Sequence, residues 1–191
     1  VGSNTVTVQV TAQDGSTQSY TVAVTRAASS DATLSALTLS QGSLSPSFAS
    51  GTLAYTALVS NSVSSLIVTP TTNDANATAI VNGASPATPV TLSVGGTTVT
   101  VQVTAQDGST QSYTVAVTRA ASSDATLSAL SLSSGSLSPS FVSGTLAYTA
   151  SVVHSVSSLI VTPTVNDANA TATVNGASAA TPVTLAVGSN T

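Results

Sequence analysis

The few side chains of this chain that could do chemistry are concentrated in one short loop and its repeat. Segment 73–76 is Asn-Asp-Ala-Asn, and segment 166–169 has the same four residues. Carboxylate and amide oxygens are ligands that Ca²⁺ accepts, which makes Asp74 and Asp167 candidate calcium ligands. Calcium takes about six to eight oxygens, usually from several carboxylates, whereas each loop offers one carboxylate. Such residues are also typical of a turn whose Asx side chains bond their own backbone, and we expect this turn without a metal or other cofactor.

The same loops contain a modification signal. Asn76-Ala77-Thr78 and Asn169-Ala170-Thr171 both match the Asn-x-Ser/Thr pattern that accepts N-linked glycans. The pattern has meaning only in an organism that glycosylates such sites. Asn76 and Asn169 are therefore possible glycosylation sites, and ordinary turn residues otherwise.

His154 is the one histidine of the chain, and no catalytic site is expected around it. General acid–base catalysis needs a histidine that a second polar group orients beside a substrate. Asn61 stands at the corresponding position of the other repeat, so the chemistry of His154 is not repeated. We interpret His154 as a surface loop residue.

Two arginines, Arg26 and Arg119, occupy the same position in two repeats, each five residues before an aspartate, Asp31 or Asp124. A hydrogen bond or ion pair from Arg119 to Asp124, or to the neighbouring module, would stiffen the junction between modules. An exposed ion pair contributes only about 0 to 1 kcal/mol. A solvated charge is the alternative, and the sequence leaves both open.

The composition excludes several classes of function. The 191 residues include two Arg and six Asp, and no Lys, Glu, Cys, Met or Trp, which gives a net charge of −4. Without Cys there is no disulfide and no thiolate nucleophile or metal ligand, and without Lys there is no Schiff base. Two arginines form no basic patch for phosphates, so no nucleic acid partner is expected. We predict a protein that is not an enzyme.

The chain also lacks the pattern of a membrane span, because its longest aliphatic run is Leu66-Ile67-Val68 and a spanning helix needs about 20 apolar residues. Ser and Thr account for 68 residues and alternate with Val, Ala and Leu. An acidic, Ser/Thr-rich chain without Lys or Cys fits a secreted or cell-surface protein, so we expect an extracellular location.

The sequence repeats itself every 93 residues. Residues 29–98 and 122–191 agree at 58 of 70 positions, and residues 1–28 and 94–121 agree at 26 of 28. Solenoid repeats have periods of about 20 to 50 residues, so this period corresponds to a whole small domain. We predict a complete repeat at 29–121, preceded by the C-terminal hairpin of another repeat at 1–28 and followed at 122–191 by a repeat without its final hairpin.

Within one repeat, apolar and polar residues alternate with a period of two. Segments 98–105 and 111–118 flank an Asp-Gly turn and predict a β-hairpin. Further strands are expected at 34–39, 53–59, 66–69, 77–81 and 90–94, with a type I′ turn at Asn82-Gly83. Seven short strands without helical periodicity predict two packed antiparallel sheets.

Differences between the two copies agree with this alternation. Within the expected strands, apolar and polar residues replace each other at positions such as Leu58/Ser151 and Ile80/Thr173. A packed interior resists such exchanges at a cost of about 1 to 3 kcal/mol, whereas a solvated face does not. We therefore predict that these positions face the solvent.

Several motifs in order resemble the cadherin-like β-sandwich domain family of bacterial surface and secreted proteins. They are Leu34-Ser35-Ala36-Leu37, Gly42-Ser43-Leu44-Ser45-Pro46, Tyr55-Thr56, Val81-Asn82-Gly83 and Tyr113-Thr114-Val115-Ala116-Val117. The resemblance covers the whole repeat. It implies an all-β, immunoglobulin-like antiparallel sandwich used in tandem on extracellular proteins, and it implies no enzyme.

These observations predict a structural module of an extracellular stalk or fibre. Its partners would be copies of itself joined head to tail, each incomplete end being completed by a hairpin from the continuing chain or from the next subunit. The first five residues equal residues 187–191, which suggests a super-repeat of 186 residues. The alternative is an adhesin module that binds cell-surface glycans or proteins, although the chain has only four Tyr, two Phe and no Trp to stack on sugars.

Overall fold

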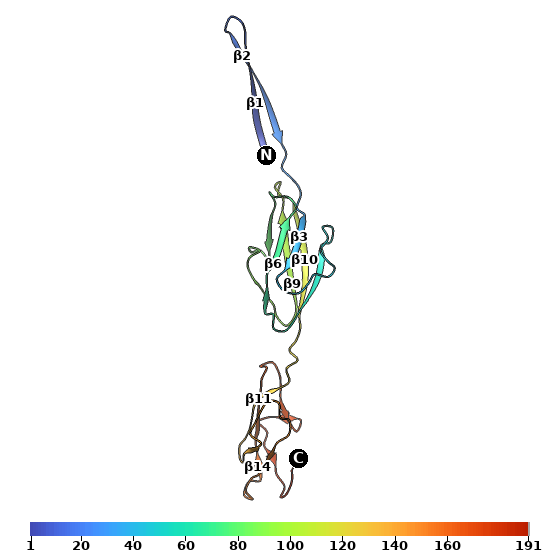
Figure 1. Ribbon diagram of the computed structural model, residues 1–191, viewed down its shortest axis with the longest axis vertical. Helices are drawn as coiled ribbons and strands as arrows, with labels where there is room; N and C mark the ends of the chain where they lie inside the picture. Colours follow the sequence, from blue (N-terminus) through green and yellow to red (C-terminus); the bar gives the residue numbers. More distant parts are fainter. Residues whose placement is uncertain (191) are drawn as a thin grey trace. The chain divides into compact units, whose positions relative to one another are not determined.

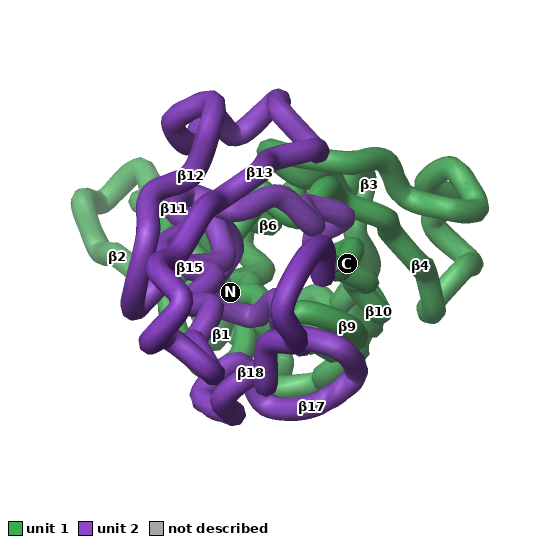
Figure 2. Tube along the Cα trace, turned by 90° about the horizontal axis from the view of Figure 1, so that it is seen from below, with its two compact units in different colours: residues 1–121 green, residues 122–191 purple. Residues whose placement is uncertain are grey.

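The computed structural model describes residues 1–190 and is built from strands and turns, with no helix among those residues. The predicted all-β class is confirmed. The chain separates into two compact units, one from Val1 to Ala121 and one that begins at Ser122; Figure 2 colours them green and purple (Figures 1 and 2).

The first unit opens with an antiparallel hairpin of β1 (Gly2–Thr11) and β2 (Thr17–Arg26). Each of these ten-residue strands alternates Val or Tyr with Thr, Ser or Gln, which is the pattern of a strand that buries one face. Every residue of both strands is nevertheless exposed.

The rest of the first unit is a β-sandwich, in which a four-stranded sheet has the order β4-β10-β9-β7. Its members are β4 (Ala54–Val59), β10 (Thr110–Arg119), β9 (Gly95–Thr104) and β7 (Thr78–Val81). The β9–β10 and β7–β9 pairs are antiparallel, whereas β10 pairs with β4 in parallel. The opposite layer consists of two antiparallel pairs: β3 (Leu34–Leu39) with β6 (Val68–Thr72), and β5 (Ser65–Leu66) with β8 (Val90–Thr91).

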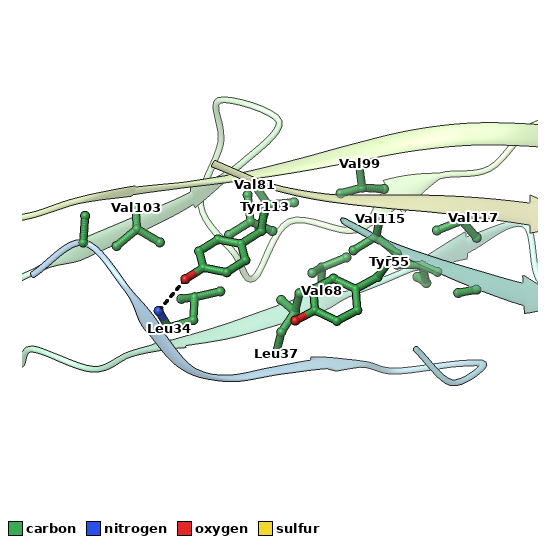
Figure 3. Packing of buried hydrophobic residues seen from close by; sticks show 14 of the residues in the cluster. Leu34, Leu37, Tyr55, Val68, Val81, Val99, Val103, Tyr113, Val115 and Val117 are labelled. Carbon is green, nitrogen blue, oxygen red and sulfur yellow. Dashed lines mark hydrogen bonds between the residues drawn. The ribbon is translucent and has the colours of Figure 1, made fainter. Parts of the chain in front are cut away.

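The core lies between these layers, where Val99, Val115 and Val117 face Leu37 and Val68 (Figure 3). The hairpin β9–β10 supplies side chains with no exposed surface at all, among them Val99, Val101, Val103, Tyr113, Val115 and Val117. The outward positions that differ between the copies, Leu58 and Ile80 among them, are 75% and 38% exposed, as the alternation predicts.

The structure refines three expected elements. The strand expected at 66–69 is divided into β5 and β6 at Ile67, whose N–H donates to Ser40 Oγ and whose carbonyl accepts from the Ser40 N–H, both at 2.9 Å. The strand expected at 90–94 ends at Thr91, and β9 begins at Gly95 rather than at residue 98. The Asn82-Gly83 turn has φ of 48° and 79°, as a type I′ turn requires.

The second unit repeats the sequence of β3 to β8 at most positions but has less regular pairing. Its strands form four antiparallel pairs: β11 (Leu127–Leu132) with β15 (Val161–Val165), β12 (Leu137–Ser138) with β13 (Thr149–Ala150), β14 (Ser158–Leu159) with β18 (Val183–Thr184), and β16 (Thr173–Val174) with β17 (Ala177–Ser178). No side chain between residues 122 and 190 is buried.

Candidate functional site

One hairpin sequence occurs twice in the described chain, in two opposite environments. As β9–β10 it completes the core of residues 29–121, where Val99, Tyr113 and Val115 have no exposed surface. As β1–β2 the same sequence leaves the equivalent Val6, Tyr20 and Val22 52%, 54% and 53% exposed. The difference arises from the neighbours, since residues 5–28 and 98–121 are identical. The apolar face of the β1–β2 hairpin is exposed to solvent in this structure.

The second unit shows the complementary surface, a cleft of about 1420 Å³. Most of its apolar lining is drawn from both layers of the unit: Leu130, Leu132, Leu137, Tyr148, Ala150, Val152, Val156, Leu159, Val161, Val174, Val183 and Leu185. Each of these residues corresponds, 93 positions earlier, to a residue of the sandwich core or one packed against it. The cleft is therefore the place that β9 and β10 fill in the complete module.

Two segments that pair with β9 and β10 in the complete module have counterparts with shorter strands in the second unit. In the complete module β10 pairs along all of Ala54–Val59, but only Thr149–Ala150 of the equivalent segment is in a strand, and that strand pairs with β12. Likewise β9 pairs with Thr78–Val81, whereas the corresponding β16 covers only two residues. Unpaired edge strands are templates for another strand.

Arg119 binds the carbonyl oxygens of its own module. Its Nε and Nη2 both donate to the Asn61 carbonyl, at 2.9 and 2.7 Å, and its Nη1 donates to the Leu92 carbonyl at 3.0 Å. The planar guanidinium thus joins the end of β10 to two loops. The sequence left open a contact with Asp124, a contact with the neighbouring module and a solvated charge. The structure shows instead a half-buried Arg119 whose guanidinium binds these two carbonyl groups. Arg26, at the same position in β2, is exposed.

Asp31 and Asp124 fasten the first strand of each module to a loop of the same module. Asp31 Oδ1 accepts from the Thr33 N–H and hydroxyl at 2.9 and 2.6 Å, and Oδ2 accepts from Asn73 Nδ2 at 2.7 Å. These hydrogen bonds lower the pKa of Asp31, and the bond from the Thr33 hydroxyl has the largest effect. Asp124 makes the same set with Thr126 and Asn166, and its pKa is also lowered.

The calcium candidates Asp74 and Asp167 serve as turn residues. Asp74 Oδ1 accepts from the N–H and the Nδ2 of Asn76 at 2.8 and 2.9 Å. A hydrogen bond from the Ser29 side chain is the largest of the causes that lower the pKa of Asp74, and the charge of Arg26 is the smallest. Asp167 and Asn169 have the same arrangement. Across residues 1–190, no three His, Cys, Asp or Glu side chains are grouped as metal ligands.

The remaining candidate residues lie at the surface. Asn76 and Asn169 are exposed, although each side-chain amide is bonded to the nearby aspartate. His154 is exposed and lines the cleft. Its counterpart Asn61 donates through Nδ2 to the Ala120 carbonyl at 3.1 Å, one residue beyond Arg119.

Sequence reasoning assigned Arg119 to the junction and overlooked its carbonyl acceptors. The sequence does contain one indication of this role. Arg119 is one of only two Arg or Lys residues, and it ends a strand that has no other charge, which suggests a specific acceptor. The acceptors themselves are backbone atoms of residues 61 and 92, and no side-chain pattern marks them.

Comparison with known proteins places this geometry in a family. The model of the cadherin-like β-sandwich domain matches residues 34–120 and 127–191. A protein of Evansella cellulosilytica named "Putative membrane protein" is 36% identical over an alignment of 97 residues, which covers 48% of this chain and 15% of that protein. In the described residues no helix is long and apolar enough to cross a membrane. Cadherin-like domains are a non-enzymatic type of module and are typically extracellular, and the chain belongs to this cadherin-like β-sandwich domain family.

Proposed function

We propose that this chain is a non-catalytic, structural segment of an extracellular stalk or fibre, built from cadherin-like modules in series. Each incomplete module is completed by a hairpin from the continuing chain or from the next subunit. The proposed location is the cell surface or the secreted space, in keeping with the family and with the membrane-protein name of the relative.

The observation that carries the proposal is where the chain enters and leaves the complete module. At the entry, the Ser29 carbonyl accepts from the Asp107 N–H at 3.0 Å, beside the turn between β9 and β10. At the exit, Arg119 and Ala120 are bound at the opposite end of β10 (Figure 1). A ten-residue strand spans about 33 Å, so entry and exit are separated by the length of the module. Modules joined in this way, from the exit of one to the entry of the next, would lengthen the protein with each added module.

The polar side chains support a structural use. Asp31 and Arg119 bind groups of their own module, and no buried side-chain nitrogen or oxygen in the described chain lacks a hydrogen-bond partner. Such fully used polar groups hold loops in place and leave little for a substrate. The segment is accordingly proposed to act without catalysis.

The aromatic residues of the complete module are also used internally, which weighs against glycan adhesion. Tyr55 and Tyr113 are buried, and Phe48 stacks on Tyr55 with ring centroids 6.1 Å apart. Sugar recognition relies on exposed aromatic faces. The stalk is therefore preferred to the adhesin.

Small-angle scattering tests the proposal. The 191-residue chain extended by one further super-repeat of 186 residues contains two more modules. Its maximum dimension should increase by about 70 to 80 Å, because each module adds a ten-residue strand of about 33 Å and its end loops. A chain whose maximum dimension stays nearly constant as modules are added would contradict a stalk. Binding to a panel of cell-surface glycans would instead favour the adhesin.

A further inference from the structure

We propose that the complete module, residues 29–121, is built to resist tension, and that its strand β10 carries the force between the points where the chain enters and leaves the module. The inference rests on the proposed function and deepens it, because a stalk that is pulled at both ends needs modules that stay folded under force. It names the strand that carries the force and the side chain that holds this strand in place.

Tension between the two ends of the module acts along the axis of β10. The chain enters at Ser29, which is bound to the turn before β10. The Ser29 N–H donates to Gln106 Oε1 at 3.2 Å, and its carbonyl accepts from the Asp107 N–H at 3.0 Å. The chain leaves the module after Arg119, the last residue of β10. The entry and the exit therefore lie at opposite ends of this strand.

The first strand of the module, β3, runs in the same direction as β10. It begins at Leu34, whose N–H donates to the hydroxyl of Tyr113 in the first half of β10 (Figure 3). Beyond the other end of β3, Gly42 lies so close to β4 that a Cβ on it would be 2.8 Å from the carbonyl oxygen of Leu58, which pairs with Thr118 near the exit. Tension therefore pulls β3 towards the entry and β10 towards the exit.

Strand β10 is bonded to a neighbouring strand on each side. It pairs with β9 along its whole length and with β4, in parallel, from Thr114 onward. The first and last bonds of the parallel pair reach beyond β4 and β10: the Thr114 N–H donates to the Leu53 carbonyl at 2.8 Å, and the Ala120 N–H donates to the Val59 carbonyl at 3.0 Å. Ladder hydrogen bonds lie across the strands, so a pull along β10 strains all of them together.

Side-chain hydrogen bonds hold β10 at its exit end. The Arg119 guanidinium donates three hydrogen bonds, to the carbonyls of Asn61 and Leu92. Asn61 Nδ2 in turn donates to the Ala120 carbonyl at 3.1 Å. Residue 61 follows β4 and residue 92 precedes β9, so these bonds attach the end of β10 to the loops of both neighbouring strands. Because hydrogen bonds from a charged donor are stronger than neutral ones, Arg119 should raise the force at which β10 begins to slide.

Pulling the full chain in two directions tests the inference. The chain has no cysteine, so a pair of introduced cysteines defines the two points of force. Ala27→Cys with Ala121→Cys pulls along β10. Ser64→Cys with Ala121→Cys pulls across it, because Ser64 is also at the exit end, where its carbonyl accepts from the Leu92 N–H at 2.8 Å. All three substituted residues are exposed.

Single-molecule force measurements should give a severalfold higher unfolding force along β10 than across it. Along the strand the hydrogen bonds are strained together, whereas across it they open one after another from the exit end. Forced unfolding is governed by the unfolding rate, so one folded module can show both values. The released length identifies each event: about 300 Å for residues 27–121 and about 200 Å for residues 64–121, at about 3.3 to 3.6 Å per residue.

Two variants of the chain separate the effect of Arg119 from general stability. Arg119→Gln removes the guanidinium. Val81→Ala is the matched control, because it creates a cavity in the core, where Val81 is 3% exposed, but in β7, an edge strand that is joined to neither end of the module. Urea titration measures the stability of each variant, and pulling along β10 measures its unfolding force. For the same loss of stability, Arg119→Gln should lower this force more than Val81→Ala.

Equal forces along and across β10 would overturn the inference, and so would a Val81→Ala variant whose unfolding force falls as much as that of Arg119→Gln for the same loss of stability. The comparison of directions retains Arg119, so it decides the question even if Arg119→Gln does not fold. Scattering tests the stalk separately. Chains that lengthen with each module but unfold at the same force in both directions would support the stalk and exclude this role of β10.

Discussion

The hydroxyl of Tyr113 accepts a hydrogen bond from the backbone N–H of Leu34 at 3.0 Å, in the fully buried core of the complete module (Figure 3). The bond joins β10 to β3, and so links the two layers of the sandwich across 79 residues of chain. Leu34 begins β3 and has no exposed surface, so water cannot replace the tyrosine as the partner of its N–H.

Tyr113→Phe should therefore destabilise the module. The substitution keeps the ring and leaves a buried N–H without an acceptor, which costs about 1 to 3 kcal/mol. Hydrogen exchange at the Leu34 amide should accelerate with it. Tyr20→Phe is the matched control, because Tyr20 has the same sequence neighbours and is 54% exposed. Equal protection of the Leu34 amide in Tyr113→Phe and the natural chain would show that the bond contributes nothing.

A second prediction concerns Gly42, whose φ is +76°. A Cβ at this position would lie 2.8 Å from the Leu58 carbonyl oxygen, a backbone atom that cannot rotate away. Gly42→Ala should lower the stability of the module by more than about 1 kcal/mol, because both the backbone conformation and the close approach disfavour a side chain.

Gly51→Ala is the control for this prediction. A Cβ there meets nothing within 4 Å, and the φ of Gly51 lies outside the left-handed region. Its urea midpoint should equal or slightly exceed that of the natural chain, since alanine reduces the freedom of the unfolded state. Similar midpoints for Gly42→Ala and Gly51→Ala would contradict the role assigned to Gly42.

The fold could be predicted from the sequence because the longer strands β4, β9 and β10 alternate buried and more exposed residues, and because Asn-Gly is a strong signal of a type I′ turn. Strand ends were less predictable. Ile67 continues an apolar run, yet its backbone bonds to Ser40, 27 residues away, and divides the strand. Likewise the acceptors of Arg119 are backbone carbonyl groups of two loops that are distant in sequence. Every residue has such a carbonyl, so the sequence does not show which ones accept a hydrogen bond.

The candidate site could be predicted in part. The 93-residue repeat showed that residues 5–28 have the sequence of the hairpin at 98–121. The sequence could not show which copy of the hairpin is buried, because residues 5–28 and 98–121 are identical and differ only in their surroundings. The exposed Val22 and the buried Val115 have the same neighbours in sequence and different neighbours in space.

A third prediction concerns acid. Hydrogen bonds, first from the Thr33 hydroxyl, lower the pKa of Asp31 below its ordinary value. A carboxyl whose pKa is lower in the folded state contributes stability above its unfolded pKa, and that stability is lost as the pH falls through the folded pKa. The thermal midpoint should therefore be constant above about pH 5 and decrease below about pH 4.

The Asp31→Asn variant tests the origin of that decrease. An amide at this position cannot be protonated in the same range, so the variant should lose less stability between pH 5 and pH 3, with those limits set by the roughly 3.9 pKa of an ordinary aspartate. Five other aspartates also have lowered pKa values, so part of the decrease should remain. An unchanged acid limb in Asp31→Asn would exclude this carboxyl as a contributor.

The last prediction compares the two modules as separate chains. Residues 29–121 contain both layers and a core with 18 buried apolar side chains, so this segment alone should fold as a monomeric β-domain with one cooperative urea transition. Residues 122–191 have the same first strands, but no side chain between 122 and 190 is buried, and the segment should unfold without a sharp transition or aggregate through its open edges. Adding the sequence of residues 6–28 after Thr191 supplies β9- and β10-like strands, and cooperative unfolding should return. Circular dichroism and urea titration of the three chains measure this directly; a cooperative transition in 122–191 alone, equal to that of the extended chain, would show that the hairpin is not what stabilises the module.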